Sequence, residues 1–230
     1  ILILSILLAA EGVLRIKWVQ GWLPAPSIGK EDSYPEIDIK LQRLNTLIQS
    51  ETVNCFLVGS SMVDAGIDPE ILSLTLNDSG QNSYHCFNFG LSGAMVETTA
   101  TIVDFLSKEY HPEMIILGIS PIEFDRTFTT TRNIGEATWI QYKLGNFSFE
   151  GWLVEHSYTY RYLLTFINMR QPNFREDYVF WEKLLTPNGF RSWTNLAFDS
   201  TGINEVWLKD FELNPVDLIG LKKIATIQDK

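Results

Sequence analysis

Short apolar segments alternate with amphipathic ones through the middle of this chain. Residues 55–58 and 114–117 are uninterrupted apolar runs of strand length, and residues 85–89 form a third candidate strand between them. Runs that are apolar on both faces are typical of strands in a parallel sheet covered on both sides. Helical spacing at 95–110 separates the second strand from the third, and another helix follows Asp68. The order strand, helix, strand, helix, strand predicts an α/β sheet with right-handed crossovers.

Further helices are predicted around this core. Residues 68–70 (Asp-Pro-Glu) combine an N-cap residue, a first-turn proline and an acid, which are signals of a helix start. Residues 214–217 (Asn-Pro-Val-Asp) repeat these signals ahead of an apolar stripe within 218–227. Apolar residues also recur at helical spacing over 37–48, which predicts a lead-in helix before the first strand.

The first ten residues contain only apolar side chains and one serine. A bilayer span needs about 20 residues, so this run is interpreted as the last part of an anchor or signal anchor. Arg15, Trp18 and Trp22 follow it, as expected at a membrane interface. The alternative is an amphipathic helix packed on the domain. We therefore assign residues 1–22 to the end of an anchor helix and 23–50 to a linker and lead-in helix.

Residues 51–230 are expected to form one domain with an aromatic-rich insertion at about 126–213. The insertion has no clear alternation of helix and strand, and only 158–169 has clear helical spacing. Because it follows the third strand, it is expected to cover the carboxyl edge of the sheet. Its rings either form a small core of their own or line a groove for an acyl group or a glycan, since aromatic faces stack on sugars.

The charge of the chain argues against nucleic acid as a partner. The formal net charge is −10, and the longest basic run is the pair Lys222 and Lys223. The sequence has no Cys/His spacing typical of zinc sites and no nucleotide-binding fingerprint, so no cofactor is expected. Cys55 and Cys86 lie in neighbouring predicted strands. They are expected to be buried free thiols rather than a disulfide, because adjacent parallel strands rarely have suitable geometry.

Candidate chemistry lies where the three predicted strands end. Gly59-Ser60-Ser61 follows the first strand, Asn88-Phe-Gly-Leu-Ser-Gly93 the second, and Gly118-Ile-Ser120 the third. In a parallel sheet these ends meet at one edge, which is where ligands of open α/β sheets bind. A serine hydroxyl beside bare backbone N–H groups is the arrangement of a nucleophile with an oxyanion hole. The alternative is that these serines only bond their own turns.

These three segments together resemble the SGNH (GDSL-like) hydrolase superfamily over residues 54–125. The resemblance implies a three-layer α/β/α sandwich with a mainly parallel, flavodoxin-like sheet. It also implies that Ser61 is the nucleophile and that its own N–H donates to the oxyanion. The N–H of Gly93 is implied as a second donor, with Gly90 as the next best match, and Ser120 stands at the position of a third donor.

Ser60, where the family usually has aspartate, and the following Gly66-Ile-Asp-Pro69 resemble a membrane-anchored branch of this superfamily. That branch includes alginate O-acetylation and teichoic-acid D-alanylation proteins. The resemblance implies a bacterial, extracytoplasmic serine esterase or O-acyltransferase. Its substrate would be an acyl ester of a cell-envelope polysaccharide or related glycan, with envelope-assembly proteins as further partners. Ser60, Asn88 and Gly90 are expected to contact this substrate.

Two departures from the family pattern affect the expected catalysis. The third block is usually Gly-x-Asn, and Ser120 replaces the asparagine; losing such a donor costs about 3 kcal/mol of transition-state stabilisation. The Asp-x-x-His block that supplies the base is absent from residues 1–230. His85 and His111 are predicted toward the amino edge of the sheet, and His156 lies in the aromatic insertion.

Two interpretations of the missing base stay open. In the first, a further strand follows the last predicted helix and the Asp-x-x-His block comes after that strand, beyond Lys230. In the second, the protein is a catalytically inactive member of the same fold that binds glycans or serves as a scaffold in an envelope assembly.

Overall fold

The computed structural model describes residues 2–29, 34–79, 83–124, 134–192 and 215–227. The chain forms two compact units. Unit 1 combines residues 1–42 with 134–183, and unit 2 combines residues 43–133 with 184–230. The central part of the predicted insertion therefore belongs to the same unit as the N-terminal segment. The parallel sheet and the candidate site belong to unit 2, whereas the described residues of unit 1 are mainly helical.

Unit 2 is built on a parallel sheet of three described strands, β1 (Cys55–Gly59), β2 (Cys86–Asn88) and β3 (Met114–Gly118). The strand order is β2-β1-β3, with β1 in the centre. Gly59 pairs with Gly118 at the carboxyl end of the sheet. All residues of β1 are buried, as expected of a central strand in a parallel sheet. The predicted mixed α/β architecture with a parallel sheet is therefore confirmed.

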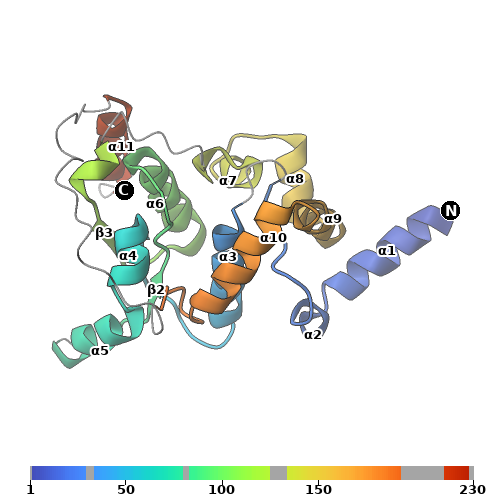
Figure 1. Ribbon diagram of the computed structural model, residues 1–230, viewed down its shortest axis with the longest axis horizontal. Coiled ribbons are helices and arrows are strands. Elements are labelled where there is room, and N and C mark those ends of the chain that lie inside the picture. Colours follow the sequence, from blue (N-terminus) through green and yellow to red (C-terminus); the bar gives the residue numbers. More distant parts are fainter. Residues whose placement is uncertain (1, 30–33, 80–82, 125–133, 193–214, 228–230) are drawn as a thin grey trace. The chain divides into compact units, whose positions relative to one another are not determined.

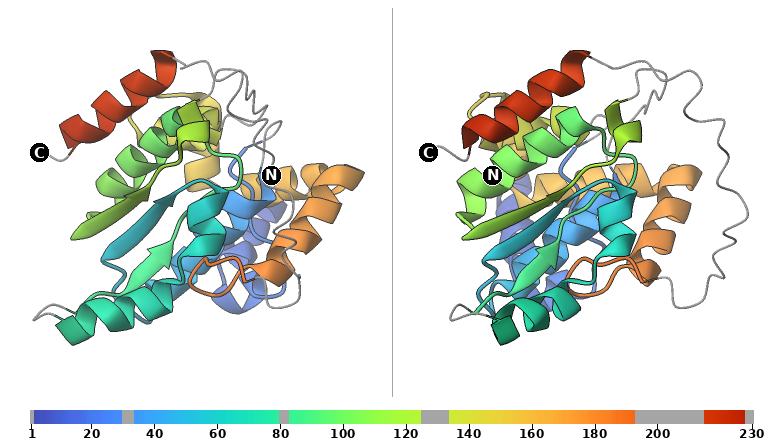
Figure 2. Two further views of the ribbon diagram at one scale, coloured as in Figure 1. Left: turned by 60° about the vertical axis from the view of Figure 1, so that its left-hand side comes forward. Right: turned by 90° about the vertical axis from the view of Figure 1, so that its left-hand side faces the viewer.

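The described helices of unit 2 are α4 (Ser61–Gly66), α5 (Pro69–Ser79), α6 (Val96–Tyr110), the 3₁₀ helix η1 (Pro121–Phe124) and α11 (Pro215–Ile227). Figure 2 shows α6 and α11 lying together over the β3 side of the sheet, while α5 lies beside β2. The predictions of α5, α6 and α11 are confirmed. The sequence did not predict α4, because six residues are too few to establish a helical period.

Cys55 and Cys86 form a disulfide, so the expectation of free thiols is wrong. The two residues face each other in register at the amino ends of β1 and β2, with their Cα atoms 4.3 Å apart. This separation is close to the shortest that a disulfide spans. The prediction relied on the rarity of disulfides between adjacent parallel strands. The register that places Cys55 opposite Cys86 could not be determined from the sequence.

Unit 1 contains most of the aromatic-rich stretch, which forms helices. Its elements are α1 (Leu2–Leu14), α2 (Lys17–Gln20), α3 (Pro35–Leu47), η2 (Ile134–Glu136), α7 (Thr138–Lys143), α8 (Phe149–His156), α9 (Tyr158–Met169) and α10 (Pro172–Leu184) (Figure 1). The last residues of α3, from Arg43 on, and the last residue of α10 belong to unit 2. Of the helices in 134–184 only α9 was predicted. Tyr162 and Trp181 are buried, whereas Phe149 and Phe166 are exposed. Because rings occupy both faces of these helices, their spacing does not reveal a helical period.

α1 is fastened to α9 by one carboxylate. Glu11 accepts hydrogen bonds from the backbone N–H groups of Tyr158 (3.0 Å) and Thr159 (2.9 Å) at the start of α9. Unbonded N–H groups and the helix dipole make a helix start favourable for an anion. Arg15 pairs with Glu11 at 2.8 Å and donates to the carbonyl of His156 at 2.7 Å. In the described part of the chain no helix has the length and apolarity to cross a bilayer, and α1 has 13 residues.

Residues 25–29, which the sequence places in a linker, are buried within unit 1. Backbone groups in such an irregular segment have no ladder or helix to satisfy them, so other partners are needed. The N–H of Ala25 donates to the hydroxyl of Tyr178 at 2.7 Å, and the N–H of Ser27 donates to the hydroxyl of Thr165 at 2.8 Å. Side chains of α9 and α10 therefore take the place of secondary structure.

The buried carboxyl of Asp38 anchors the same segment. It accepts the hydroxyl of Ser27 at 2.8 Å and the N–H of Ile28 at 3.1 Å. Burial raises the pKa of Asp38 to about 7, against the opposing effects of these two hydrogen bonds and of the positive charge of Arg161. Arg161 in turn donates to the carbonyl of Pro26 at 2.9 Å. Unit 1 therefore encloses a carboxyl that titrates near neutral pH.

Breaking the disulfide is expected to destabilise unit 2. The bond joins positions 31 residues apart, and the chain-entropy model gives about 3–4 kcal/mol for a loop of this length. Urea unfolding should therefore have a lower midpoint when reductant is present. The variant Cys55→Ser/Cys86→Ser serves as the control and should unfold at that lower midpoint with or without reductant. An unchanged midpoint for the reduced wild type would contradict the stabilising role.

Candidate functional site at the carboxyl edge of the sheet

One buried carboxylate, Glu123 of η1, joins the ends of β1 and β3. Its Oε1 atom accepts the hydroxyl of Ser60 at 2.6 Å and the backbone N–H of Ser120 at 3.2 Å. The segment after β2 meets the same region, because the N–H of Leu91 donates to the carbonyl of Gly59 at 2.9 Å. The three segments selected from the sequence are therefore connected at one edge of the sheet.

α4 lies so close to the strand ends that only glycine fits beneath it. A Cβ atom added at Gly118 would lie 2.3 Å from Cγ2 of Val63, and one added at Gly59 would lie 2.5 Å from the same atom. A Cβ atom added at Gly90 would lie 2.5 Å from the backbone nitrogen of Asp64. Each of these separations is far below a normal carbon contact. Gly59, Gly90 and Gly118, one from each strand or the segment after it, thus form the surface on which α4 packs, which we call the seat of α4.

Asn88 holds the carboxyl end of α4. Its side-chain amide donates to the carbonyls of Val63 at 2.8 Å and Ile67 at 2.9 Å, and its Oδ1 atom accepts the N–H of Gly90 at 2.9 Å. Carbonyls at a helix end need such outside partners. Asn88 is fully buried. Asn88 and Gly90 therefore help to seat α4, and their contact with a substrate stays a prediction.

The two adjacent serines have different surroundings. Ser60 is buried, and its hydroxyl donates to Glu123 and caps α4 by accepting the N–H of Met62 at 3.5 Å. Ser61, the first residue of α4, is partly exposed. Its hydroxyl has no hydrogen-bond partner among the described residues. The hydroxyl of Ser61 is thus free within the described part of the chain, while that of Ser60 is buried and supports the helix.

Two of the expected oxyanion donors are also available. Gly93 has a φ of 76°, in the left-handed region that favours glycine, and its N–H has no partner within the described part of the chain. The N–H of Ser120 is bonded to Glu123, but the hydroxyl of Ser120 has no partner in that same part. The loops after β2 and β3 therefore each retain one hydrogen-bond donor.

The sequence did not indicate the charged residues of this site. Arg191 Nε pairs with Asp64 Oδ2 at 2.8 Å, and Arg191 Nη2 donates to the carbonyl of Ser61 at 3.3 Å. Asp64 is the third residue after Ser61, and Glu123 the fifth after Gly118, so proximity along the chain could have indicated both. Arg191 is 130 residues from Ser61, and no local signal points to it.

The described carboxyl edge contains no histidine. His85 immediately precedes β2 and pairs with Glu51 at 3.9 Å, and His111 lies between α6 and β3. Both therefore lie toward the amino edge of the parallel strands. His156 belongs to unit 1, where its ring stacks on Trp152 with centroids 4.9 Å apart. Within unit 2, no described histidine is placed to act as a base for Ser61.

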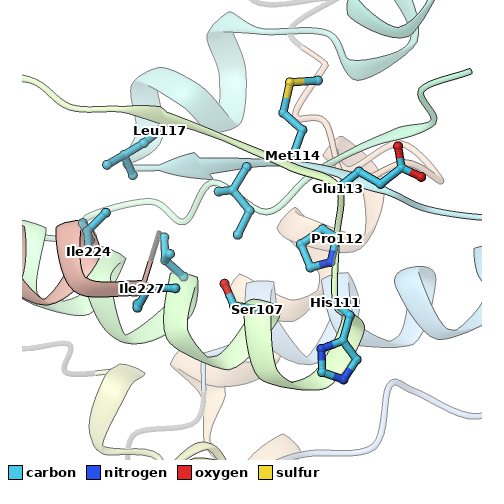
Figure 3. Close-up of a pocket in the computed structure, with 10 residues that line it drawn as sticks. Ser107, His111, Pro112, Glu113, Met114, Leu117, Ile224 and Ile227 are labelled. Carbon is cyan, nitrogen blue, oxygen red and sulfur yellow. The ribbon is translucent and has the colours of Figure 1, made fainter. Parts of the chain in front are cut away.

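A groove of about 600 Å³ lies between α6, β3 and α11. Figure 3 shows Leu117, Ile224 and Ile227 toward one end of the groove and Pro112 and Glu113 toward the other. β3 is an edge strand, so its outer side has no neighbour among the described strands. The groove has a mixed lining, with Ser107, His111 and Glu113 beside its apolar residues, and it lies beside a sheet edge at which another strand could pair.

Comparisons with models of known families, with curated proteins and with solved structures find no match to this chain. The chemistry of the site is therefore inferred from its geometry. It contains the free hydroxyl of Ser61, the N–H of Gly93 and the hydroxyl of Ser120, supported by Glu123 and an ion pair. With a base, a hydroxyl such as that of Ser61 can attack an ester carbonyl, and N–H and O–H donors such as the other two can hold the resulting oxyanion.

The close approach of α4 to β3 can be tested with a compensating pair of substitutions. Gly118→Ala is expected to destabilise the protein by about 1–3 kcal/mol, because the added methyl group overlaps Val63. The second substitution Val63→Ala removes that overlap and should restore part of the loss. Chemical unfolding of the two single variants and the double variant gives the coupling free energy.

Gly59→Ala provides the matched control for this cycle. Its added Cβ atom would also lie 2.4 Å from the carbonyl oxygen of Gly118, which Val63→Ala does not remove. Val63→Ala should therefore rescue Gly118→Ala but not Gly59→Ala. Equal rescue of both, or of neither, would disagree with the seat described for α4.

Proposed function

We propose that this protein is a serine esterase or O-acyltransferase that acts on acyl esters of a cell-envelope polysaccharide or related glycan. Ser61 Oγ attacks the ester carbonyl carbon, and the charge moves to the carbonyl oxygen. The bond to the alcohol then breaks, and the alcohol leaves with the proton that a base took from Ser61. Water or a sugar hydroxyl attacks the acyl-serine in the second step. That attack gives hydrolysis or transfer and returns the proton to Ser61.

The main support for this proposal is the position of Ser61. It begins a helix seated on three strand ends, and its hydroxyl is free of described partners while that of Ser60 is engaged. The N–H groups of Ser61 and Gly93 and the hydroxyl of Ser120 are the proposed oxyanion donors. The parallel order β2-β1-β3 with its flanking helices is compatible with the SGNH-type sandwich that the proposal assumes.

The proposal needs a base that the described residues of unit 2 do not supply. The groove beside β3 is a suitable place for a further parallel strand, and α11 lines it with Ile224 and Ile227. Parallel strands end at the same edge of a sheet. An Asp-x-x-His block that follows such a strand would therefore reach the edge at which Ser61 lies.

A membrane anchor and an extracytoplasmic location are part of the proposal. Leu2, Ile3 and Leu8 of α1 are 75%, 76% and 65% exposed, which is unfavourable in water and favourable in a bilayer. Disulfides such as Cys55–Cys86 persist mainly in oxidising compartments, which supports a location outside the cytoplasm.

Labelling with a fluorophosphonate tests whether Ser61 is an activated nucleophile. We expect the full-length, folded protein to be labelled on Ser61, and Ser61→Ala to lose the label while keeping its melting temperature. Ser107→Ala, which changes a serine of the β3 groove, serves as the control and should label normally. Absence of labelling in folded full-length protein, or labelling that survives Ser61→Ala, would count against the proposed function.

A row of exposed rings in unit 1 favours glycan binding as a second candidate function. Phe149 is 67% and Trp152 is 40% exposed. The Phe149 and Trp152 rings stack at 6.0 Å with an interplanar angle of 14°, and Trp152 stacks on His156 at 4.9 Å and 23°. The parts of these nearly parallel rings that stay exposed offer apolar surface to the C–H faces of sugar rings. This function needs no base and would suit an inactive member of the fold.

Binding to a hexamer of β-1,4-linked N-acetylglucosamine, measured by calorimetry, tests this second function. Trp152→Ala should weaken binding about twofold to tenfold, since a stacked ring contributes about 0.5–1.5 kcal/mol. Trp18→Ala removes another exposed tryptophan of unit 1, 72% exposed in α2, and should leave the affinity unchanged. Equal losses in the two variants, or no binding by the wild type, would reject glycan stacking at this row.

A further inference from the structure

We infer that Arg191 is a positioning residue for Ser61, which it fixes by clamping the first turn of α4. Its backbone N–H donates to the carbonyl of Asp64 at 3.0 Å. Its Nε atom pairs with the carboxylate of Asp64 at 2.8 Å, and its Nη2 atom reaches the carbonyl of Ser61 at 3.3 Å. The catalytic meaning of this clamp rests on the proposed function of Ser61, whereas the clamp itself is a property of unit 2.

α4 needs such a clamp because it is short. Isolated helices of fewer than about 12 residues are marginal in water, and α4 has six residues. Asn88 holds its carboxyl end at Val63 and Ile67, and Arg191 holds its beginning at Ser61. Without Arg191, the first turn would be held mainly by the Ser60 cap and would fray more readily. The direction of the Ser61 hydroxyl would then vary.

The clamp depends on the shape of the guanidinium group as well as on its charge. Asp64 is fully buried and the side chain of Arg191 is 9% exposed, so the pair is shielded from water. Arginine presents several N–H groups in a rigid plane, which lets one side chain contact the carboxylate and the Ser61 carbonyl together. Lysine has a single ammonium group on a flexible stem and would hold one of these contacts less well.

Arg191 lies at the end of a loop that follows α10 and packs against β2. Leu185 and Arg191 form an isolated antiparallel bridge that closes this loop. The carbonyl of Asn188 accepts the N–H of Asn88 at 2.9 Å, which attaches the loop to β2. Arg43 holds the loop from α3 by donating to the carbonyls of Leu185 and Thr186. Arg43 thus contacts the loop itself, whereas Arg191 contacts Ser61 and Asp64 of α4.

Arg43 therefore provides a matched control for the test. The inactivation of full-length protein by a fluorophosphonate gives a maximal rate constant for labelling and an apparent binding constant. Arg191→Lys should lower the maximal rate constant by about tenfold to a hundredfold with little change in the binding constant, because the nucleophile is misdirected. Arg43→Lys loosens the same loop at Leu185 and Thr186 and should change the rate constant less than threefold.

A second variant separates positioning from stability. Asp64→Asn/Arg191→Met removes both buried charges, so neither is left unpaired, and such replacements are often neutral for stability. Labelling should remain slow in this variant even where its melting temperature equals that of the wild type. Labelling at the wild-type rate in a stable double variant, or equal slowing in Arg191→Lys and Arg43→Lys, would overturn the positioning role.

Hydrogen exchange distinguishes a failure of this inference from a failure of the proposed function. Exchange of the backbone amides of residues 63–67 should be faster in Arg191→Lys than in Arg43→Lys. A wild type that is not labelled, combined with this difference in exchange, would reject the proposed function and retain the clamp. Equal exchange in the two variants would reject the clamp, whatever the result of labelling.

Discussion

The seat of α4 on three glycines is the contact on which the rest of unit 2 depends. Gly59, Gly90 and Gly118 have no side chains, so a six-residue helix can lie against the ends of all three strands. This close approach places the carbonyls of α4 within reach of Asn88 and Arg191. It also leaves the first residue of the helix at the carboxyl edge. A side chain at any of the three glycines would displace the helix and every polar contact that depends on it.

The two ends of the sheet are held together by different kinds of interaction. At the amino end, the disulfide between Cys55 and Cys86 ties β1 to β2 covalently. At the carboxyl end, Glu123 joins the ends of β1 and β3 by hydrogen bonds, and the Asp64–Arg191 pair joins α4 to the loop after α10. Buried polar groups are costly unless they are satisfied, but when satisfied they fix one arrangement. A covalent tie at one end allows the other end to be built from such groups.

Local sequence patterns predicted most of the described elements of unit 2, and in unit 1 they predicted α1, α3 and α9 but not α7, α8 and α10. Apolar runs and helix-start signals gave β1, β3, α5 and α11, because each follows from a few neighbouring residues. They also located the strand ends at which Ser61 lies. The burial of residues 25–29 depends on side chains of distant helices, such as Tyr178, and the position of Arg191 depends on a loop docked on β2. Contacts between segments this far apart leave no pattern in either segment alone.

The residue at position 60 shows how a difference from a resembled sequence pattern can be explained by a distant partner. The SGNH superfamily, which the sequence resembles, usually has aspartate at this place, and this chain has a serine. Ser60 donates its hydroxyl to the buried carboxylate of Glu123 at 2.6 Å. An aspartate at the same place would put two carboxylates within bonding distance, and one of them would have to bind a proton or leave the core. A serine supplies the proton without a second charge. Ser60 and Glu123 are thus a matched pair, and together they leave Ser61 as the serine with a free hydroxyl at this edge.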